Sequence, residues 1–370
     1  MFYPDVPIQT ANDDVLERHS FAEQLAQAMI AYQSPEAFTI GLYGPWGSGK
    51  TSLINLMVEE IKRRNEELEQ TGEDCIIVQF KPWMCSSSEQ MVSQFFCVLA
   101  EEINSESDEK KVKGLQEKIE LAQQTVGLLY QYASMMQVTQ FDPKIAAAST
   151  GLDLLAKSIK LFQRYKKSKS QQFMTLQAQK ESLQNKLRDY KKKIIVIIDD
   201  LDRLSSDEII AVFQLVKSLA DFPYMIYLLS FDRDVVVKAL ADVQKGDGQA
   251  YLEKIIQMPF EMPQASEEDI EAVFWKRLGQ IVPEQDCLMQ QNCWEVLFDK
   301  GVGSYLLSIR DITRYMNTFA FKYAILKEET DLQDLLLLTF LQVFEPETFA
   351  QLPFYSCLLY TSDAADDLIG

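Results

Sequence analysis

Short apolar runs alternate with amphipathic segments along much of the chain. Four runs rich in β-branched or aromatic residues predict strands, at Phe38–Tyr43, Cys75–Phe80, Lys193–Ile198 and 224–230. The run 193–198 is apolar after its lysine, as expected for a central parallel strand that is buried on both faces. Helical spacing of apolar residues appears between the strands, over residues 16–30, 50–68, 88–103, 207–220 and 233–240. This alternation predicts an α/β fold with a parallel sheet.

The pattern changes in two later regions of the chain. Residues 105–193 are polar and helical in character, and within them 171–190 carries spaced apolar residues among many Gln and Lys residues. That segment predicts a helical hairpin or a short coiled-coil arm rather than core. After Pro263 the pattern stays helical to residue 350. We therefore expect an N-terminal helix, phosphate loop and first half of the core over 1–104, a helical insert over 105–192, the second half of the core over 193–263, a C-terminal helical lid region over 264–356 and a non-native tail over 357–370.

The tail is set apart because it looks like the translation of a transposase-based sequencing adaptor, from Cys357 to Asp367. We exclude residues 357–370 from fold reasoning, as one would exclude an expression scar. The tail contains three aspartates and no Lys or Arg, so the formal net charge becomes -19 + 3 = -16 without it. We expect the natural protein to continue past Ser356.

Composition excludes several classes of function. A net charge of -19 argues against a protein that binds nucleic acid over its whole surface, because phosphate backbones attract clustered Lys and Arg. The six cysteines form no Cys-x-x-Cys pair, and the single histidine is His19, so neither a zinc site nor a Cys–His nucleophile is indicated. The chain shows no signal peptide and no apolar run of about 18 residues. We expect a cytoplasmic protein with free thiols.

The segment between the first predicted strand and the next helix carries the clearest chemistry. It matches Gly-x-x-x-x-Gly-Lys-[Ser/Thr], the phosphate-binding loop, in the strand–loop–helix context that this motif requires. Such a loop points successive backbone N–H groups at phosphates, and the helix N-terminus adds positive potential. We expect Lys50 to reach the β- and γ-phosphates and Thr51 to bind Mg²⁺. The predicted nucleotide-binding residues are Gly44, Pro45, Trp46, Gly47, Ser48, Gly49, Lys50, Thr51 and Ser52.

Acidic residues follow the most apolar strand. A buried parallel strand delivers the residues after it to the carboxyl edge of the sheet, where ligands of open α/β sheets bind. We expect Asp199 to hold Mg²⁺ and Asp200 to orient the attacking water, which requires the strand to end there because adjacent strand residues point to opposite faces. Asp202 and Arg203 follow, either paired with each other as a structural bridge or with Arg203 in a trans-acting or signalling role.

These motifs occur in one order with further segments, and together they resemble the KAP family of P-loop NTPases, which includes a phage-exclusion ATPase of plasmids and animal membrane scaffold proteins. The resemblance covers most of residues 14–349. Beside the phosphate loop and Ile198-Asp-Asp-Leu-Asp-Arg203, it rests on Asp14-Val-Leu-Glu-Arg18 with Phe21-Ala22, Phe80-Lys-Pro-Trp83, Ser230-Phe-Asp-Arg233, Tyr251-Leu-Glu-Lys-Ile-Ile-Gln-Met-Pro259 and Arg310-Asp-Ile-Thr-Arg-Tyr-Met-Asn317.

The resemblance implies an additional-strand P-loop fold with ATP as substrate. It also implies that Ser230 or Asp232 senses the γ-phosphate, and that Arg310 reports nucleotide state to the lid, with Arg314 as the alternative one turn along. Surface salt bridges remain the plain alternative for both arginines. Many members carry transmembrane helices before the acidic strand, whereas residues 105–193 are polar here, so membrane insertion is not expected.

Other residues near the motifs favour ordinary roles. Phe80 and Trp83 could line the nucleotide base, although core packing is the better interpretation of large aromatic residues. His19, with Arg18, could lie near the adenine, but a surface histidine is the better interpretation. Residues 152–169 form a basic amphipathic pattern that could contact an anionic membrane or nucleic acid, and we favour a helix packed on the domain. The arm after it is expected to hold a protein partner or a second copy of the chain.

Three functions follow from these residues. The first is an ATPase that uses Mg²⁺ and hydrolysis to drive a conformational switch, which family analogy connects with phage defence or exclusion. The second is a nucleotide-gated scaffold or interaction module with little turnover. A small-molecule kinase is the third, but no phosphoryl-acceptor site is visible in the sequence. ATP is expected rather than GTP, because no Asn-Lys-x-Asp guanine-reading motif occurs.

Overall fold

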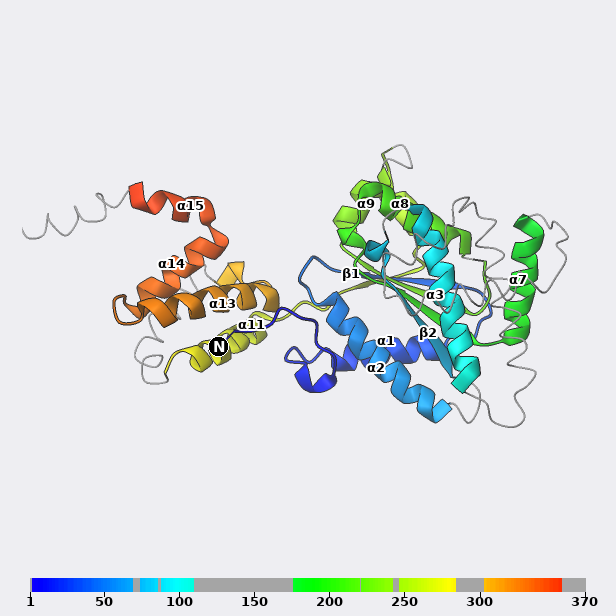
Figure 1. Cartoon of the computed structure of the whole chain (residues 1–370), viewed down its shortest axis with the longest axis horizontal. Helices are drawn as coiled ribbons and strands as arrows, with labels where there is room; N and C mark the ends of the chain where they lie inside the picture. The colour runs from blue at the N-terminus through cyan, green and yellow to red at the C-terminus, as the bar shows by residue number, and fades with distance from the viewer. Residues whose placement is uncertain are drawn as a thin grey trace, which may run out of the picture. The chain divides into compact units, whose positions relative to one another are not determined.

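The computed structural model describes residues 2–68, 74–85, 88–109, 176–219, 221–241, 246–283 and 303–354. It divides into two compact units, which are coloured along the chain in Figure 1 and described here separately. The α/β unit consists of Ile8–Asp13 and Arg18–Met262, and the helical unit of Met1–Pro7, Asp14–Glu17 and Pro263–Gly370. The predicted basic helix at 152–169 and the tail at 357–370 lie outside the described residues.

A parallel sheet forms the centre of the α/β unit. Its strands are β1 (Phe38–Tyr43), β2 (Cys75–Phe80), β3 (Lys193–Ile198), β4 (Met225–Phe231) and β5 (Met258–Glu261). In the described part of the chain they lie in the order β2-β3-β4-β1-β5, and every neighbouring pair is parallel. The α/β class and the parallel sheet predicted from the alternating pattern are therefore confirmed.

The strand bounds agree closely with the sequence pattern except at the edge. Strands β1, β2 and β3 begin and end at the predicted residues, and β4 is shifted by one residue. The short strand β5 was not predicted, because Pro259 interrupts its pattern. A proline lacks the backbone N–H that an inner strand needs. Within the described residues β5 pairs with β1 alone, at the sheet edge, where proline is tolerated.

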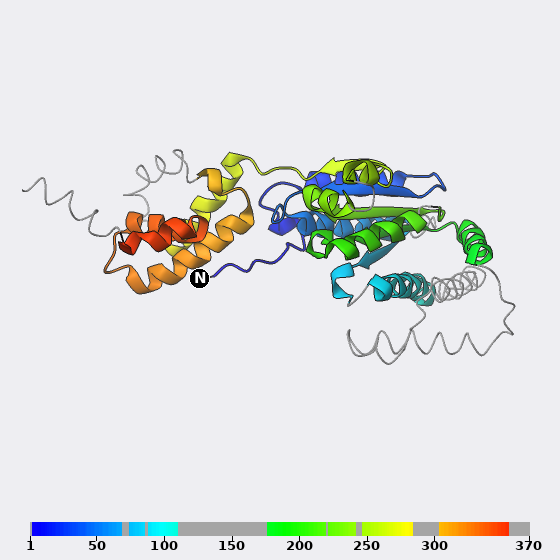
Figure 2. The same cartoon turned by 90° about the horizontal axis from the view of Figure 1, so that it is seen from above.

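Helices cover both faces of the sheet. Helices α1 and α2 lie on one side in Figure 1, with α8 and α9 on the other, and Figure 2 shows the same unit turned by 90°. This explains why β3 and β4 are apolar at nearly every position, since both faces of each strand are buried. The helices are α1 (His19–Ala31), α2 (Lys50–Leu68), α3 (Ser88–Glu109), α7 (Leu176–Tyr190), α8 (Ser206–Leu219), α9 (Arg233–Ala241) and α10 (Gly248–Glu253), with short 3-10 turns η1 (Ala11–Asp13), η2 (Pro82–Met84) and η3 (Leu201–Arg203).

Helix α7 corrects one prediction. Residues 171–190 were expected to form an arm outside the core, but Leu183 and Leu187 are fully buried in the main core, and Tyr190 packs against it. Their spacing of four and three residues places them on one helical face. The Gln and Lys residues that suggested an arm cover the other side, so a narrow apolar stripe is enough to attach the helix.

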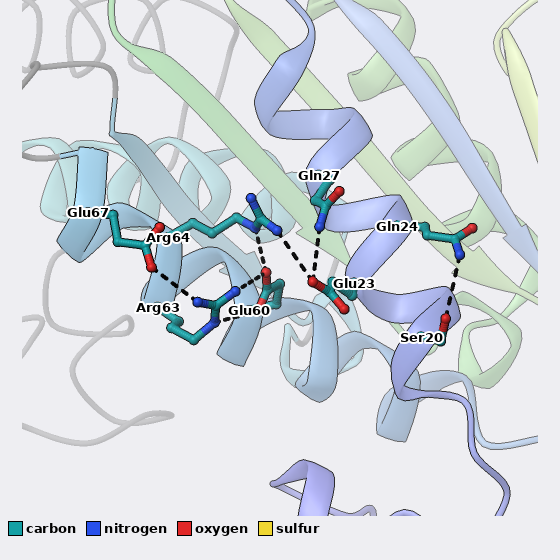
Figure 3. Close-up of polar contacts among 8 residues, drawn as sticks. All are labelled: Ser20, Glu23, Gln24, Gln27, Glu60, Arg63, Arg64 and Glu67. Carbon is teal, nitrogen blue, oxygen red and sulfur yellow. Dashed lines mark hydrogen bonds and ion pairs between the residues drawn. The ribbon is translucent and has the colours of Figure 1, made fainter.

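A polar network joins α1 to α2, as shown in Figure 3. Glu60 is buried on α2, and Arg63 and Arg64 both donate hydrogen bonds to its carboxylate. These hydrogen bonds, Arg63's first, hold the pKa of Glu60 below its ordinary value despite burial. Arg64 also pairs with Glu23 of α1 at 3.4 Å. The network fastens the two helices whose N-termini lead into the candidate site.

The helical unit has a core of its own. It contains α11 (Glu267–Ile281), α13 (Ile309–Leu326), α14 (Leu332–Phe344) and α15 (Pro346–Gln351), with η5 (Gly303–Tyr305) and η6 (Leu352–Phe354). Phe274, Tyr315 and Phe319 are fully buried among these helices. The N-terminal segment packs here too: the amide of Asn317 bonds both the N–H and the carbonyl of Tyr3, at 2.7 and 2.8 Å.

Candidate nucleotide site

The phosphate-loop residues connect β1 directly to α2. Strand β1 ends at Tyr43 and α2 begins at Lys50. Gly47 and Gly49 have φ values of 88° and 90°, a backbone region that favours glycine. Gly44 is needed for close approach instead, because a Cβ there would lie 2.7 Å from Ser48 Oγ and 2.8 Å from Met262 Cβ. The three glycines of the loop are therefore each explained by local geometry.

Lys50 is buried at the start of α2, with 6% of its surface exposed. Its Nζ donates to the carbonyl oxygens of Gly44 at 2.8 Å and Pro45 at 3.2 Å. It also forms an ion pair with Asp202 Oδ2 at 3.4 Å, and the side chain of Asp202 is equally buried. A buried ammonium group needs such partners because burial without them is costly. The ion pair brings the phosphate loop to the acidic segment after β3.

The acidic segment begins where β3 ends, at Ile198. Asp199 is buried, and its Oδ1 accepts a hydrogen bond from the backbone N–H of Asp200 at 2.8 Å. Asp200 has a left-handed backbone, φ 61° and ψ 39°, and leads into η3. The strand therefore ends where it must if the two carboxylates are to serve one site.

Asp202 and Arg203 do not form the bridge considered from the sequence. Arg203 Nε pairs with Asp200 Oδ1 at 3.1 Å, whereas Asp202 pairs with Lys50. The short turn of η3 sends these adjacent side chains in different directions. Burial raises the pKa of Asp200, and the nearby Asp199 and Asp202 carboxylates raise it further, against the opposing charges of Arg203 and Lys50.

The alternation of side chains along the strands places further groups near the loop. In β3 and β4, Ile197 and Leu228 pack in the cluster that includes α1 and α2. Ser230 lies two residues after Leu228, so it faces the same side, and continuing the alternation past β3 places Asp199 there as well. This is the side on which α2 begins at Lys50. The register therefore directs Asp199 and Ser230 towards the phosphate loop.

At the loop and at the ends of β3 and β4, the oxygen atoms Ser48 Oγ, Asp202 Oδ1 and Ser230 Oγ are buried and have no hydrogen-bond partner within the described residues. Buried polar groups in proteins are nearly always hydrogen-bonded, so an unpaired group calls for an explanation. Ser48 belongs to the phosphate loop, Asp202 contacts Lys50, and Ser230 is the last residue but one of β4, the strand beside β3. A polar ligand with its own water shell at this edge would give these oxygens partners.

Two residues of the site were missed in the sequence. Arg18, just before α1, donates from Nη1 to the carbonyl of Ser48 at 2.5 Å, and a Cβ on Gly49 would lie 2.8 Å from the same nitrogen. Asp202 was considered only as a partner of Arg203. Neither contact has a local signal, since the partners are 30 and 152 positions apart. In the sequence, Arg18 was noted as part of the family resemblance and, with His19, as a possible neighbour of the adenine, but not as a partner of the phosphate loop.

Other predicted residues have partners that the sequence did not indicate. The hydroxyl of Ser52 accepts a hydrogen bond from the N–H of Ile8 at 3.3 Å. Asp232 Oδ1 accepts from the N–H groups of Asp234 and Val235, in the manner of a helix N-cap for α9. These contacts give both residues structural roles beside the predicted ones.

The two candidate sensor arginines belong to the helical unit. Arg310 pairs with Asp5 at 2.9 Å, and Arg314 donates to the carbonyl of Val343 at 3.2 Å.

The two aromatic residues of the Phe-Lys-Pro-Trp segment separate. Phe80 is buried in the core as expected, but Trp83 is 43% exposed, which corrects the prediction of core packing. The guanidinium of Arg203 lies 5.8 Å from the Trp83 ring centre, a cation–π distance. Pro82 ends the strand run and turns the chain at η2, so Trp83 leaves the sheet and lies against η3.

Metal-binding clusters and membrane-spanning helices both bear on the predicted class. No group of three or more His, Cys, Asp or Glu side chains with metal-binding geometry occurs among the described residues. A phosphate-loop site does not need such a cluster. It binds Mg²⁺ through one hydroxyl, one carboxylate and the phosphates themselves. Within the same residues, none of the helices has both the length and the apolar character to cross a bilayer.

A parallel sheet with a glycine-rich loop between β1 and α2, and acids at the end of β3, defines a P-loop NTPase. The chain belongs to the KAP family: the family's sequence description, KAP family P-loop domain, matches residues 18–326, well over half of the chain. The resemblance inferred from the motifs is thereby confirmed.

The individual proteins that resemble this chain share only a small part of its sequence. The phage T7 exclusion protein of Escherichia coli (strain K12) is 26% identical over 355 residues, which cover 93% of this chain and 46% of that protein. The chain thus spans about half the length of this curated relative. Among solved structures, the ORC2 protein of Aeropyrum pernix in ADPNP and ADP complexes has 10% identity and a TM-score of 0.39, covering 92% of this chain and 69% of that one. The ORC1 protein of the same organism in complex with DNA has 10% identity and a TM-score of 0.40, covering 88% and 65%.

Proposed function

We propose that this chain binds ATP with Mg²⁺ and hydrolyses it to drive a conformational switch. The observation that carries the proposal is the buried contact of Lys50 with Asp202 at 3.4 Å. This contact joins the phosphate loop to the acidic end of β3, so the cation and the carboxylates of a phosphoryl-transfer site share one place at the sheet edge.

The residues at this edge fit a nucleotide with a magnesium ion. Backbone N–H groups of the loop and the N-terminus of α2 are suited to phosphate oxygens. The hydroxyl of Thr51 and the carboxylate of Asp199 are hard oxygen donors, which Mg²⁺ prefers, and these two residues would hold it. The unpaired oxygens of Ser48 and Ser230 add polar groups that a hydrated ligand can satisfy. When bound, Mg²⁺ neutralises charge that develops on the phosphates.

Asp200 is the proposed residue that orients and polarises the attacking water. Its raised pKa favours such a role, because a carboxylate that binds a proton more tightly is a better base. Arg310 remains the proposed sensor in the helical unit, with Arg314 as the alternative. Ser230 and Asp232 remain the two candidates for sensing the γ-phosphate.

A nucleotide-gated scaffold with little turnover is the second candidate. The proposed phosphate-binding lysine and the proposed base are both engaged in ion pairs, Lys50 with Asp202 and Asp200 with Arg203. A site whose cation and base must first leave their partners favours slow, switch-like hydrolysis.

Steady-state phosphate release tests the proposal. Lys50→Ala and Asp199→Asn should each reduce ATP-dependent release at least about 100-fold, because removing transition-state charge stabilisation costs several kcal/mol. Removal of Mg²⁺ with EDTA should abolish release in the unchanged protein. Lys62→Ala, an exposed lysine of the same helix, is the matched control and should leave the rate unchanged. Release that persists in both site variants would rule out hydrolysis at this site, and binding without release would favour the scaffold.

We further propose a role in phage exclusion, which rests on the relative of that name. We propose that the protein acts in the cytoplasm, as a homo-oligomer or with a protein partner held through the helical insert. The efficiency of phage plating on cells that express the protein should fall, and Lys50→Ala should restore it. If the unchanged protein and Lys50→Ala protected the cells equally, phage exclusion would not depend on nucleotide binding.

A further inference from the structure

The loop lysine is already bound to an anion of the chain itself. Among the described residues, Lys50 Nζ has three acceptors, and only one of these, Asp202 Oδ2, carries a full negative charge. Both side chains are 6% exposed. At short range and away from water, a carboxylate competes strongly with any phosphate for the same ammonium group.

The surroundings of Asp202 show an incompletely satisfied carboxylate. Its Oδ1 is buried and has no hydrogen-bond partner among the described residues. Arg203, the neighbouring cation, is engaged with Asp200 instead. A carboxylate with one satisfied oxygen is poorly stabilised where it is, and it can be displaced more easily than one with a full set of partners. Asp202 is therefore suited to exchange rather than to permanent attachment.

We propose that Asp202 is an internal competitor for the phosphate-binding lysine, which an incoming nucleoside triphosphate must displace. The proposal rests on the proposed function, since it concerns the same nucleotide. While the Lys50–Asp202 pair persists, only the fraction of molecules with a released lysine binds phosphate at full strength, so the apparent dissociation constant is raised by the reciprocal of that fraction. By linkage, the bound nucleotide weakens the hold of Lys50 on Asp202 by the same factor.

The competitor has a second consequence for the acidic segment. Asp202 lies in η3, the turn that follows Asp200. Displacement from Lys50 would move the turn that also carries Arg203, the ion-pair partner of Asp200. Nucleotide binding would thus be coupled to the position of the proposed base, Asp200, through Asp202 and Arg203 of the same short turn.

The test is nucleotide affinity in Asp202→Asn, measured by isothermal titration calorimetry with ATP and with ADP. Asparagine keeps the shape of the side chain and removes its charge, so we expect about tenfold tighter binding. The tightening should be of similar size with Mg²⁺ and with EDTA, because the competitor acts on the lysine and not on the metal. Asp202→Glu keeps the charge and should stay within about threefold of the unchanged protein. Asp207→Asn, an exposed carboxylate on α8, is the matched control for net charge.

Thermal unfolding adds a readout that does not depend on turnover. Without nucleotide, Asp202→Asn should unfold at a lower temperature than the unchanged protein, because a buried ammonium group loses its charged partner. With saturating ATP its midpoint should rise by more than that of the unchanged protein. If asparagine prevents folding, the smaller Asp202→Ser serves for the same two measurements.

The outcomes separate this inference from the proposed function. Unchanged affinity in Asp202→Asn would make Asp202 a structural residue and overturn the inference. Weaker binding only with Mg²⁺ would make it part of the metal site, which also overturns it. In both cases, ATP binding that Lys50→Ala abolishes would leave the proposed function intact. Absence of Lys50-dependent binding in the unchanged protein would overturn the proposed function, and the inference with it.

Discussion

The two units of this protein hold their candidate cations in opposite ways. In the α/β unit, Lys50 and Asp202 are both almost fully buried. In the helical unit, Arg310 and Asp5 lie at a shorter distance, 2.9 Å, but are 29% and 51% exposed. Distance alone would rank the second pair as stronger. Burial reverses the ranking, because water and salt screen exposed pairs while a buried charge depends on its partner.

The same contrast between buried and exposed positions applies along α7, and it predicts the largest effect on stability. Leu183→Ala should destabilise the protein by about 2–4 kcal/mol, because it leaves a cavity in the main core. Asn185→Ala, exposed on the same helix, should cost no more than about 0.5 kcal/mol. Chemical denaturation of the two variants measures the difference. If both variants changed the stability equally little, α7 would be an arm outside the core, as its polar composition suggested.

Arg18 is an intermediate case between the buried and the exposed charged groups, because its contact with the phosphate loop is partly buried. Hydrogen bonds from charged groups contribute about 1.5–3 kcal/mol, so Arg18→Ala should weaken ATP binding about 10- to 100-fold. Arg18→Lys keeps the charge but not the planar donor set and should recover only part of the affinity. Titration calorimetry on both variants measures this. Unchanged affinity in Arg18→Ala would leave the arginine without a role in shaping the loop.

Asp200 tests how burial acts on an acid near the site. Its raised pKa means that the folded protein holds a proton there more tightly than the unfolded chain does. The associated stability is present below the ordinary aspartate pKa and is lost as pH rises through the raised value. Asp200→Asn should therefore increase the unfolding temperature at neutral pH, by about 2–4 °C for each kcal/mol, and less at acid pH. If the unfolding temperature of Asp200→Asn rose by the same amount at every pH, the raised pKa of Asp200 would not be the cause.

Asp5 in the helical unit predicts the smallest effect. Its pair with Arg310 is largely exposed, so Asp5→Asn should change the free energy of unfolding by no more than about 1 kcal/mol. High salt should reduce even that difference, because it screens exposed charges. Denaturation at low and high ionic strength provides the measurement. A loss of several kcal/mol would show that exposure is a poor guide to this pair and would weaken the contrast with Lys50.

Much of the α/β unit was predictable from the chain alone. The bounds of β1, β2, β3 and α2 follow from apolar runs and helical spacing, because these patterns act locally. The glycine positions of the loop carry their own backbone requirements, as the φ values of Gly47 and Gly49 show. Local patterns and the family motifs together therefore determined the class of protein and the place of the candidate site.

Tertiary structure decided the partners within that framework. Which aspartate meets Lys50, whether Trp83 enters the core and whether Arg18 reaches the loop all depend on packing between segments far apart in the chain. The edge strand β5 forms because it pairs with the backbone of β1, although Pro259 within it is unfavourable for a strand. Secondary structure is dictated over a few residues, but the pairing of side chains is set only when the whole unit is assembled.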